Sequence, residues 1–197
     1  MYSENMGVSK YKDSAEGAIY HLYNRGNHKQ LIFDQTADYQ LYLGMLKKFC
    51  REENFSIIAY CLMPNHIHLI VRQGGLSNPS RLIARLHTSY AMYFNDTYKK
   101  VGHLFQGRYK QKIVESDNYL LQLVSYLHLN PVKDQIVSSP EKYPWSSIGW
   151  YQQPARNRQW GICDADVVSQ LGLRNIDRAE SVRLARQLSP YDVFDPA

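Results

Sequence analysis

The sequence lacks several features, and each absence argues against a class of protein. No apolar run among the 197 residues approaches the roughly 18 residues that a transmembrane helix needs, and the longest, Phe55–Met63, is only as long as a strand. The first residues are polar and include Glu4, which argues against a secretory signal. Three scattered cysteines, Cys50, Cys61 and Cys163, argue against a disulfide framework and against a cysteine metal site. We therefore expect a protein of the reducing cytoplasm that does not enter a membrane.

The common catalytic signatures are also missing. The sequence contains no GxGxxG or GxxxxGK[ST] phosphate loop, no HExxH and no GxSxG. We therefore expect no nucleotide cofactor. Few acidic residues lie near the only His-x-His pair, which disfavours a nuclease that holds two metal ions with carboxylates.

Positive charge is present, and it is concentrated in one block. The chain has a formal net charge of +5, yet Arg81 to Lys112 carries seven basic residues and one acid, so the rest of the chain is close to neutral. Six aromatic residues lie among those charges. Such a block is typical of a protein that binds a polyanion with stackable bases, although a solvated basic face is an alternative.

The apolar pattern predicts alternating strands and helices. Strands are expected over residues 18–24, 55–62 and 66–72, and helices over 36–50, 79–95 and 117–130, the last with Asp117 as N-cap and Pro131 as its stop. Residues 102–114 are typical of a second short hairpin or of one bulged strand that turns at Gln106-Gly107. The order β-α-β-β-α-β predicts an α+β fold, a split βαβ antiparallel sheet flanked by helices.

The chain divides into one domain and a tail in this interpretation. Residues 1–150 form the domain, and residues 151–197 form a helical appendage that is too short for a core of its own. Within the appendage, helices are expected over 165–171 and 177–188, after a linker at 152–159.

The pair His66-Ile67-His68 is the first candidate for chemistry. Side chains alternate between the faces of a strand, so both imidazoles share one face while Ile67 and Leu69 face the core. Two imidazoles so placed can converge on one metal ion, but a third protein ligand is then needed from elsewhere. A pair of exposed strand histidines is the alternative.

The second candidate is the polar stripe of the helix expected over 117–130. Residues four apart lie on one helical face, which groups Gln122, Tyr126 and Asn130, whereas His128 lies off the stripe and is expected to be structural. This spacing would suit a tyrosine nucleophile beside an amide metal ligand. A packing role for one of 16 tyrosines is the alternative.

Six sequence blocks then follow one another over roughly residues 15 to 150. They are His21–Asn27 (HLYNRGN), Met63–Val71 (MPNHIHLIV), Gly102–Lys110 (GHLFQGRYK), Tyr119–Leu121 (YLL), Tyr126–Val132 (YLHLNPV) and Tyr143–Ser147 (YPWSS). In composition, order and spacing they resemble the signature blocks of the REP-associated tyrosine transposases. That group belongs to the single-tyrosine transposases with a histidine-hydrophobe-histidine (HUH) motif. No matched block is missing.

The resemblance implies a ferredoxin-like HUH fold that acts on single-stranded DNA at or near hairpins. It implies that His66, His68 and Asn130 are metal ligands and that Tyr126 is the nucleophile. Gln122, one turn before Tyr126 on the polar stripe, is expected to be a supporting residue that could form a hydrogen bond. Tyr126 would form a 5′-phosphotyrosine and release a 3′-OH, which can later rejoin strands without ATP. Imidazole and amide ligands suit Mg²⁺ or Mn²⁺ with waters completing the shell.

DNA binding is expected from the basic block and from the turn after the first strand. The residues expected to contact DNA are Arg25, Asn27, Arg85, Arg108, Lys110 and Lys112. Two other functions stay open: a hairpin-DNA-binding regulator that does not cleave, and a phosphodiesterase that uses water with Tyr126 as a structural residue. A monomer is expected rather than a homodimer.

Overall fold

The computed structural model describes residues 16–152, 162–170, 172 and 182–183. Four strands form one antiparallel sheet: β1 (Ile19–Arg25), β2 (Phe55–Met63), β3 (His66–Gln73) and β4 (Lys110–Ile113). The strand order across the sheet is β2-β3-β1-β4. Together with α1 (Thr36–Glu52) and α2 (Pro79–Tyr98), this gives the predicted order β-α-β-β-α-β. The predicted α+β, ferredoxin-like fold is confirmed.

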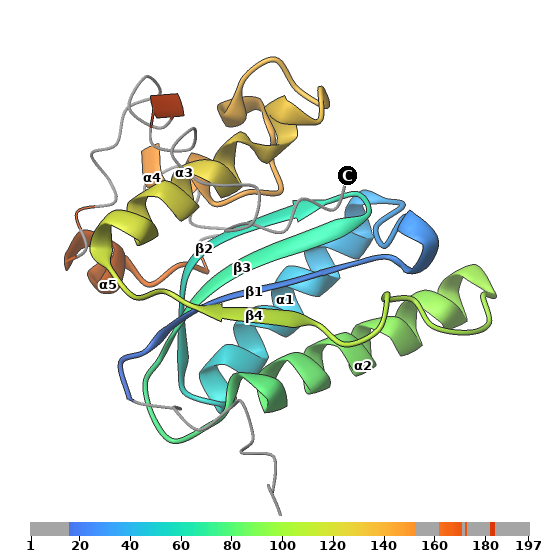
Figure 1. Cartoon of the computed structure of the whole chain (residues 1–197). Coiled ribbons are helices and arrows are strands. Elements are labelled where there is room, and N and C mark those ends of the chain that lie inside the picture. The colour runs from blue at the N-terminus through green and yellow to red at the C-terminus, as the bar shows by residue number, and fades with distance from the viewer. Residues whose placement is uncertain (1–15, 153–161, 171, 173–181, 184–197) are drawn as a thin grey trace, which may run out of the picture.

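The two faces of the sheet have different covers. Figure 1 shows α1 and α2 side by side on one face and α3 (Asp117–Lys133) on the other side of the molecule. Alternate strand residues point toward α1 and α2, and they are at most 2% exposed: Tyr20, Leu22, Ile67, Leu69 and Val71. These residues place the main core between the sheet and the two helices, so the histidine pair lies on the other face, as predicted.

The hairpin between β2 and β3 is as tight as the sequence predicts. Met63 pairs with His66, and only Pro64 and Asn65 form the turn. The turn also anchors the chain after β1, because the Pro64 carbonyl accepts from Ile32 N (2.8 Å) and the Asn65 carbonyl accepts from Gly26 N (2.7 Å). A Cβ atom at Gly26 would lie 2.0 Å from the Gln30 carbonyl oxygen, so only glycine fits there.

The helices begin where side chains satisfy their first amide groups. Asn78 Oδ1 accepts from Ser80 N at the start of α2, and Asp38 Oδ2 accepts from Gln35 N and Asp34 N at the start of α1. The prediction that Asp117 caps α3 was wrong. Ser116 is the N-cap, and its hydroxyl accepts from Tyr119 N.

Two further predictions about this region were wrong. Pro131 lies inside the last turn of α3 instead of ending it, because the proline ring accommodates helical φ and only one backbone hydrogen bond is lost. Residues 102–109 form no strand and therefore no hairpin. Among them only Phe105 makes a bridge, to Gly26, and β4 begins at Lys110.

The described part of the C-terminal segment packs on β2. It includes the short helix α5 (Ala165–Gln170). The other short helices are η1 (Asn27–Lys29) after β1, and η2 (Pro140–Lys142) and α4 (Ile148–Gln152) after α3. Cys163 and Val168 join the core, and Asp164 N donates to the Ile57 carbonyl. The predicted linker, except Gln152, and most of the predicted helix over 177–188 lie outside the described residues.

All three cysteines are buried and unpaired. Within the described ranges, none of the helices combines the length and the apolar character needed to cross a bilayer.

Candidate active site

His66 and His68 form a pair of buried imidazoles on the face of the sheet opposite α1 and α2. They are 4% and 1% exposed. Their ring centroids are 5.3 Å apart and their planes are nearly perpendicular. The alternative of two exposed strand histidines is therefore wrong.

Each histidine of the pair is held by a second polar side chain through Nδ1. His66 Nδ1 lies 2.7 Å from Asn65 Oδ1, and His68 Nδ1 lies 2.9 Å from His21 Nε2. With Nδ1 bonded in this way, the opposite ring nitrogen, Nε2, is the one that can bind a metal ion. His68 Nε2 is buried and has no hydrogen-bond partner among the described residues. Burial, followed by the neighbouring His21 and His66, holds the pKa of His68 well below its usual value, so the ring is neutral.

Helix α3 brings Tyr126 to this pair. The Tyr126 ring centroid lies 6.2 Å from that of His68, with the rings edge to face. The phenol is half-buried, and Lys133 Nζ lies 5.7 Å from its ring centroid. The polar stripe predicted on this helix therefore meets the predicted histidine pair.

Asn130 lies one helical turn after Tyr126 on the same stripe. It is 4% exposed, and its Nδ2 atom is buried with no partner among the described residues. No three His, Cys, Asp or Glu side chains in the described ranges gather closely enough to hold a metal ion. Asn130 is therefore a candidate third protein ligand of another kind, and this assignment stays a prediction. Two imidazoles, one of them with an unpaired Nε2, and an amide that would bind through its Oδ1 atom fit a divalent cation of the Mg²⁺ or Mn²⁺ class.

Two other polar residues of α3, Gln122 and His128, lie on different sides of the helix. Gln122 is half-buried one turn before Tyr126, on the stripe. His128 is buried on the opposite side, where its Nε2 lies 2.7 Å from Ser147 Oγ and burial lowers its pKa to about 3. His128 is thus a structural histidine, as expected.

Three of the predicted DNA-binding residues line one cavity beside the histidine face. The cavity has a volume of about 130 Å³, and its lining is Tyr23, Asn24, Arg25, Gln106, Arg108 and Lys110. Strand pairing places Lys110 opposite Tyr23 and Lys112 opposite His21. Since Tyr23 pairs with His68 on the other side of β1, both lysines share the face of the histidine pair.

Arg25 and Asn27 are fixed by the segment before β4. The Arg25 guanidinium donates to Gln106 Oε1, and Asn27 N donates to the Leu104 carbonyl at 2.9 Å. Asn27 belongs to η1 and does not line the cavity.

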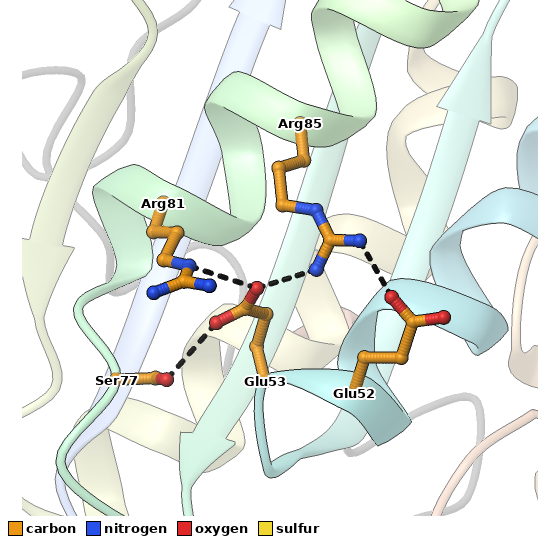
Figure 2. Close-up of polar contacts among 5 residues, drawn as sticks. All are labelled: Glu52, Glu53, Ser77, Arg81 and Arg85. Carbon is orange, nitrogen blue, oxygen red and sulfur yellow. Dashed lines mark hydrogen bonds and ion pairs between the residues drawn. The ribbon is translucent and has the colours of Figure 1, made fainter.

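Arg85 lies elsewhere. Figure 2 shows it on α2, where its guanidinium donates to Glu53 Oε1 (2.5 Å) and to Glu52 Oε2 (2.6 Å), while Arg81 also contacts Glu53. Because α2 covers the opposite face of the sheet, the structure does not bring Arg85 to the histidine pair (Figure 1).

Sequence reasoning assigned no role to several residues of this site. His21 and Tyr23 alternate along β1 as His66 and His68 do along β3, and an antiparallel pairing of those strands would have placed all four on one face. Lys133 follows Asn130 by three residues, a spacing that places it on the same side of the helix.

Comparisons with known proteins concern the family and the fold. A family model described as "Transposase IS200 like" matches residues 14–130, a span that contains the histidine pair, Tyr126 and Asn130. A REP-associated tyrosine transposase of Haemophilus influenzae is 29% identical, with 72% of this chain and 86% of that protein covered.

A solved structure, of a REP-associated tyrosine transposase bound to a REP hairpin, has the same fold. It superposes with a TM-score of 0.60 at 20% identity over 82% of this chain and 93% of the other. The family match spans more than half of the sequence. The chain belongs to the IS200-like transposase family.

Proposed function

We propose that this protein is a metal-dependent endonuclease and strand transferase that cleaves single-stranded DNA at or near hairpins through a 5′-phosphotyrosine. The observation that carries the proposal is the Tyr126 ring, edge to face with His68 at 6.2 Å, on the helix that also supplies Asn130. A water-dependent phosphodiesterase or a DNA-binding regulator would not need this combination.

His66, His68 and Asn130 would hold the metal ion. When bound, a divalent cation would polarise the scissile phosphate and stabilise the charge that develops in the transition state. The protein's own contribution is orientation. His21 of β1 holds the Nδ1 atom of His68, and Asn65 of the turn before β3 holds the Nδ1 atom of His66. Helix α3 places Tyr126 and Asn130 one turn apart.

Tyr126 Oη is the nucleophile in this proposal. It attacks phosphorus, the phenolic proton leaves, the new Oη–P bond forms, and the P–O3′ bond breaks with a proton added to the departing 3′ oxygen. A later attack by a 3′-OH on the phosphotyrosine reverses these changes and joins strands. A free tyrosine has a pKa near 10. Lys133 Nζ lies 5.7 Å from the ring centroid, which places a cation beside the proposed nucleophile.

DNA binding would use the open part of the same face. Arg25, Arg108 and Lys110 surround a cavity that also contains Tyr23, and Lys112 follows along β4. Cations beside a half-buried aromatic ring that lines an open cavity suit a strand whose bases are not paired. A hairpin target is supported by the fold relative that was solved with a REP hairpin.

The catalytic tyrosine would act within its own chain. Tyr126 lies beside His68 of the same polypeptide, so a monomer contains every group that the mechanism needs.

The test uses a labelled single-stranded hairpin with flanking sequence from the gene's own neighbourhood. Wild type and Tyr126→Phe are incubated with it in Mg²⁺, in Mn²⁺ and in EDTA, and the products are separated on a denaturing gel. We expect an SDS-resistant protein–DNA adduct that requires metal and disappears in Tyr126→Phe. Cleavage that survives in Tyr126→Phe would identify water as the nucleophile, and binding without cleavage would favour a regulator.

A mixing experiment tests action within one chain. His68→Ala and Tyr126→Phe are each expected to be inactive, and their mixture is expected to stay inactive if each chain needs both residues. Recovery of adduct in the mixture would instead show that the tyrosine is supplied by a second copy.

A further inference from the structure

His21 contacts His68 from the neighbouring strand, at the ring nitrogen opposite the proposed metal-binding atom. The two residues are on neighbouring strands and on one face, and their Nε2 and Nδ1 atoms are 2.9 Å apart. His21 is 0% exposed and His68 is 1% exposed. Their rings are close to parallel, and Tyr23 stacks on His21 with a centroid distance of 4.7 Å. Contact on both sides fixes the orientation of the His21 ring.

This contact can carry only one proton. If His68 Nδ1–H donates to His21 Nε2, then His68 Nε2 keeps a lone pair and can bind a cation. If His21 Nε2–H donates instead, His68 carries its proton on Nε2 and cannot be a ligand. The choice of donor therefore decides whether His68 is able to bind metal.

The proposed metal site requires the first arrangement, which is the one that the other histidine ligand also has. His66 Nδ1 meets Asn65 Oδ1, an oxygen that only accepts, so the proton of His66 is on Nδ1. His68 Nε2 has no hydrogen-bond partner among the described residues, although it is buried. His21 Nδ1 is buried without such a partner as well, so in the protein alone either arrangement leaves one N–H group unsatisfied. A cation at His68 Nε2 needs a lone pair on that atom, and only the first arrangement supplies it.

We propose that His21 is a positioning residue that accepts the Nδ1 proton of His68 and so holds the Nε2 lone pair of His68 ready for a divalent cation. This inference rests on the metal site of the proposed function. His21 does not contact the metal, since its Nε2 atom is engaged by His68 and no group of three metal-binding side chains forms in the described part of the chain.

The first test is made on the metal-free protein and needs no activity. Long-range ¹H–¹⁵N spectra of uniformly ¹⁵N-labelled protein distinguish the two tautomers of a neutral imidazole. We expect wild-type His68 to carry its proton on Nδ1. A wild-type His68 protonated on Nε2 would overturn the inference.

The second test measures Mn²⁺ affinity by calorimetry or by EPR in three variants. His21→Leu removes the acceptor and is expected to weaken Mn²⁺ binding by about 10- to 100-fold. His21→Gln can place Oε1 near the position of the imidazole Nε2, and it is expected to recover most of that loss. His128→Leu is the matched control, since it also removes a buried, hydrogen-bonded imidazole, yet it should bind Mn²⁺ like wild type.

Recovery of Mn²⁺ affinity in His21→Gln would show that His21 acts through its hydrogen bond to His68 and not through packing alone. Equal affinity in wild type and His21→Leu, or an equal loss in His128→Leu, would contradict the role of His21. If His21→Leu does not fold, His21→Gln and the wild-type spectra still decide. A wild type that binds no Mn²⁺ would overturn the metal site itself, whatever the tautomer of His68.

Discussion

Two clusters of polar groups lie on opposite sides of the sheet, and they differ in how fully their buried members are paired. Between α1 and α2, Glu53 is 3% exposed and its carboxylate accepts from Arg81, Arg85 and Ser77 (Figure 2). On the other face, His21 Nδ1, His68 Nε2 and Asn130 Nδ2 are buried without partners among the described residues. Folded proteins pair most of their buried polar atoms.

The difference separates a structural cluster from a site. The fully paired carboxylate of Glu53 connects the end of α1 to α2, which is a structural role. Unpaired nitrogens next to a tyrosine are unfavourable in the protein alone, and a ligand can satisfy them. Variants that change only one of the two clusters test whether one supports stability and the other supports function.

The largest effect is expected from Asn130→Ala. Removing the amide deletes a proposed metal ligand, so adduct formation should fall by at least about 100-fold. Because Nδ2 has no partner and alanine favours helices, Tm should change by no more than about 2 °C. Single-turnover gel assays and thermal unfolding measure the two quantities. A large fall in Tm together with normal activity would show that Asn130 is a structural residue and not a metal ligand.

The next effect is expected for the triple substitution of Arg108, Lys110 and Lys112 by glutamine. Binding of single-stranded DNA should weaken by about 10-fold or more near 0.1 M salt, and the slope of log K against log salt should become shallower by about two units. Fluorescence anisotropy at several salt concentrations measures both.

The matched control removes the same charge from the opposite side of the molecule. Lys47, Lys48 and Lys99 lie on or at the end of α1 and α2, and their substitution by glutamine should leave the slope unchanged. Equal slopes in the two triple variants would mean that the basic face around β4 does not bind DNA.

The fold could be predicted from the sequence because its signals are local. Alternation placed His66 and His68 on one face, and helical spacing placed Tyr126 with Asn130. The errors arose where the choice depends on distant contacts. Residues 102–109 have hairpin-like composition, yet their carbonyls and amides pair with residues 25–30 instead of with each other.

The candidate site could be predicted only in part, for a similar reason. The role of His21 depends on strand register, which no single segment encodes. For Arg85 the sequence predicted a role in DNA binding, and the structure places the residue away from the histidine pair. It lies within the basic block in sequence, but Glu52 and Glu53, more than 30 residues away, pair with it.

Glu53→Gln tests the paired cluster. Hydrogen bonding by Arg85, followed by that of Ser77 and the charge of Arg81, holds the pKa of the Glu53 carboxyl below its usual 4.5. The unfolded chain therefore takes up this proton first, and the stabilisation is complete above pH 4.5 and is lost as pH falls through the lower folded value.

At pH 7 we expect Glu53→Gln to lower Tm by a few degrees and to leave adduct formation by the folded protein unchanged. The difference in Tm from wild type should shrink as the pH is lowered below 4.5. Thermal unfolding over a pH series measures it. A difference in Tm that stays constant down to the acid limit would show that the ion pairs do not stabilise the fold.

The smallest effect is expected from Arg85→Gln, and it bears directly on the comparison. The guanidinium is engaged by two carboxylates on the face opposite the histidine pair, so its loss should change DNA affinity by less than about twofold and should leave the salt slope unaltered. Its effect on Tm should be no larger than that of Glu53→Gln, since Arg81 still pairs with Glu53. A fall in affinity as large as that of the Arg108, Lys110 and Lys112 variant would mean that DNA also contacts α2. The assignment of the two sides of the sheet, one to stability and one to DNA, would then be wrong.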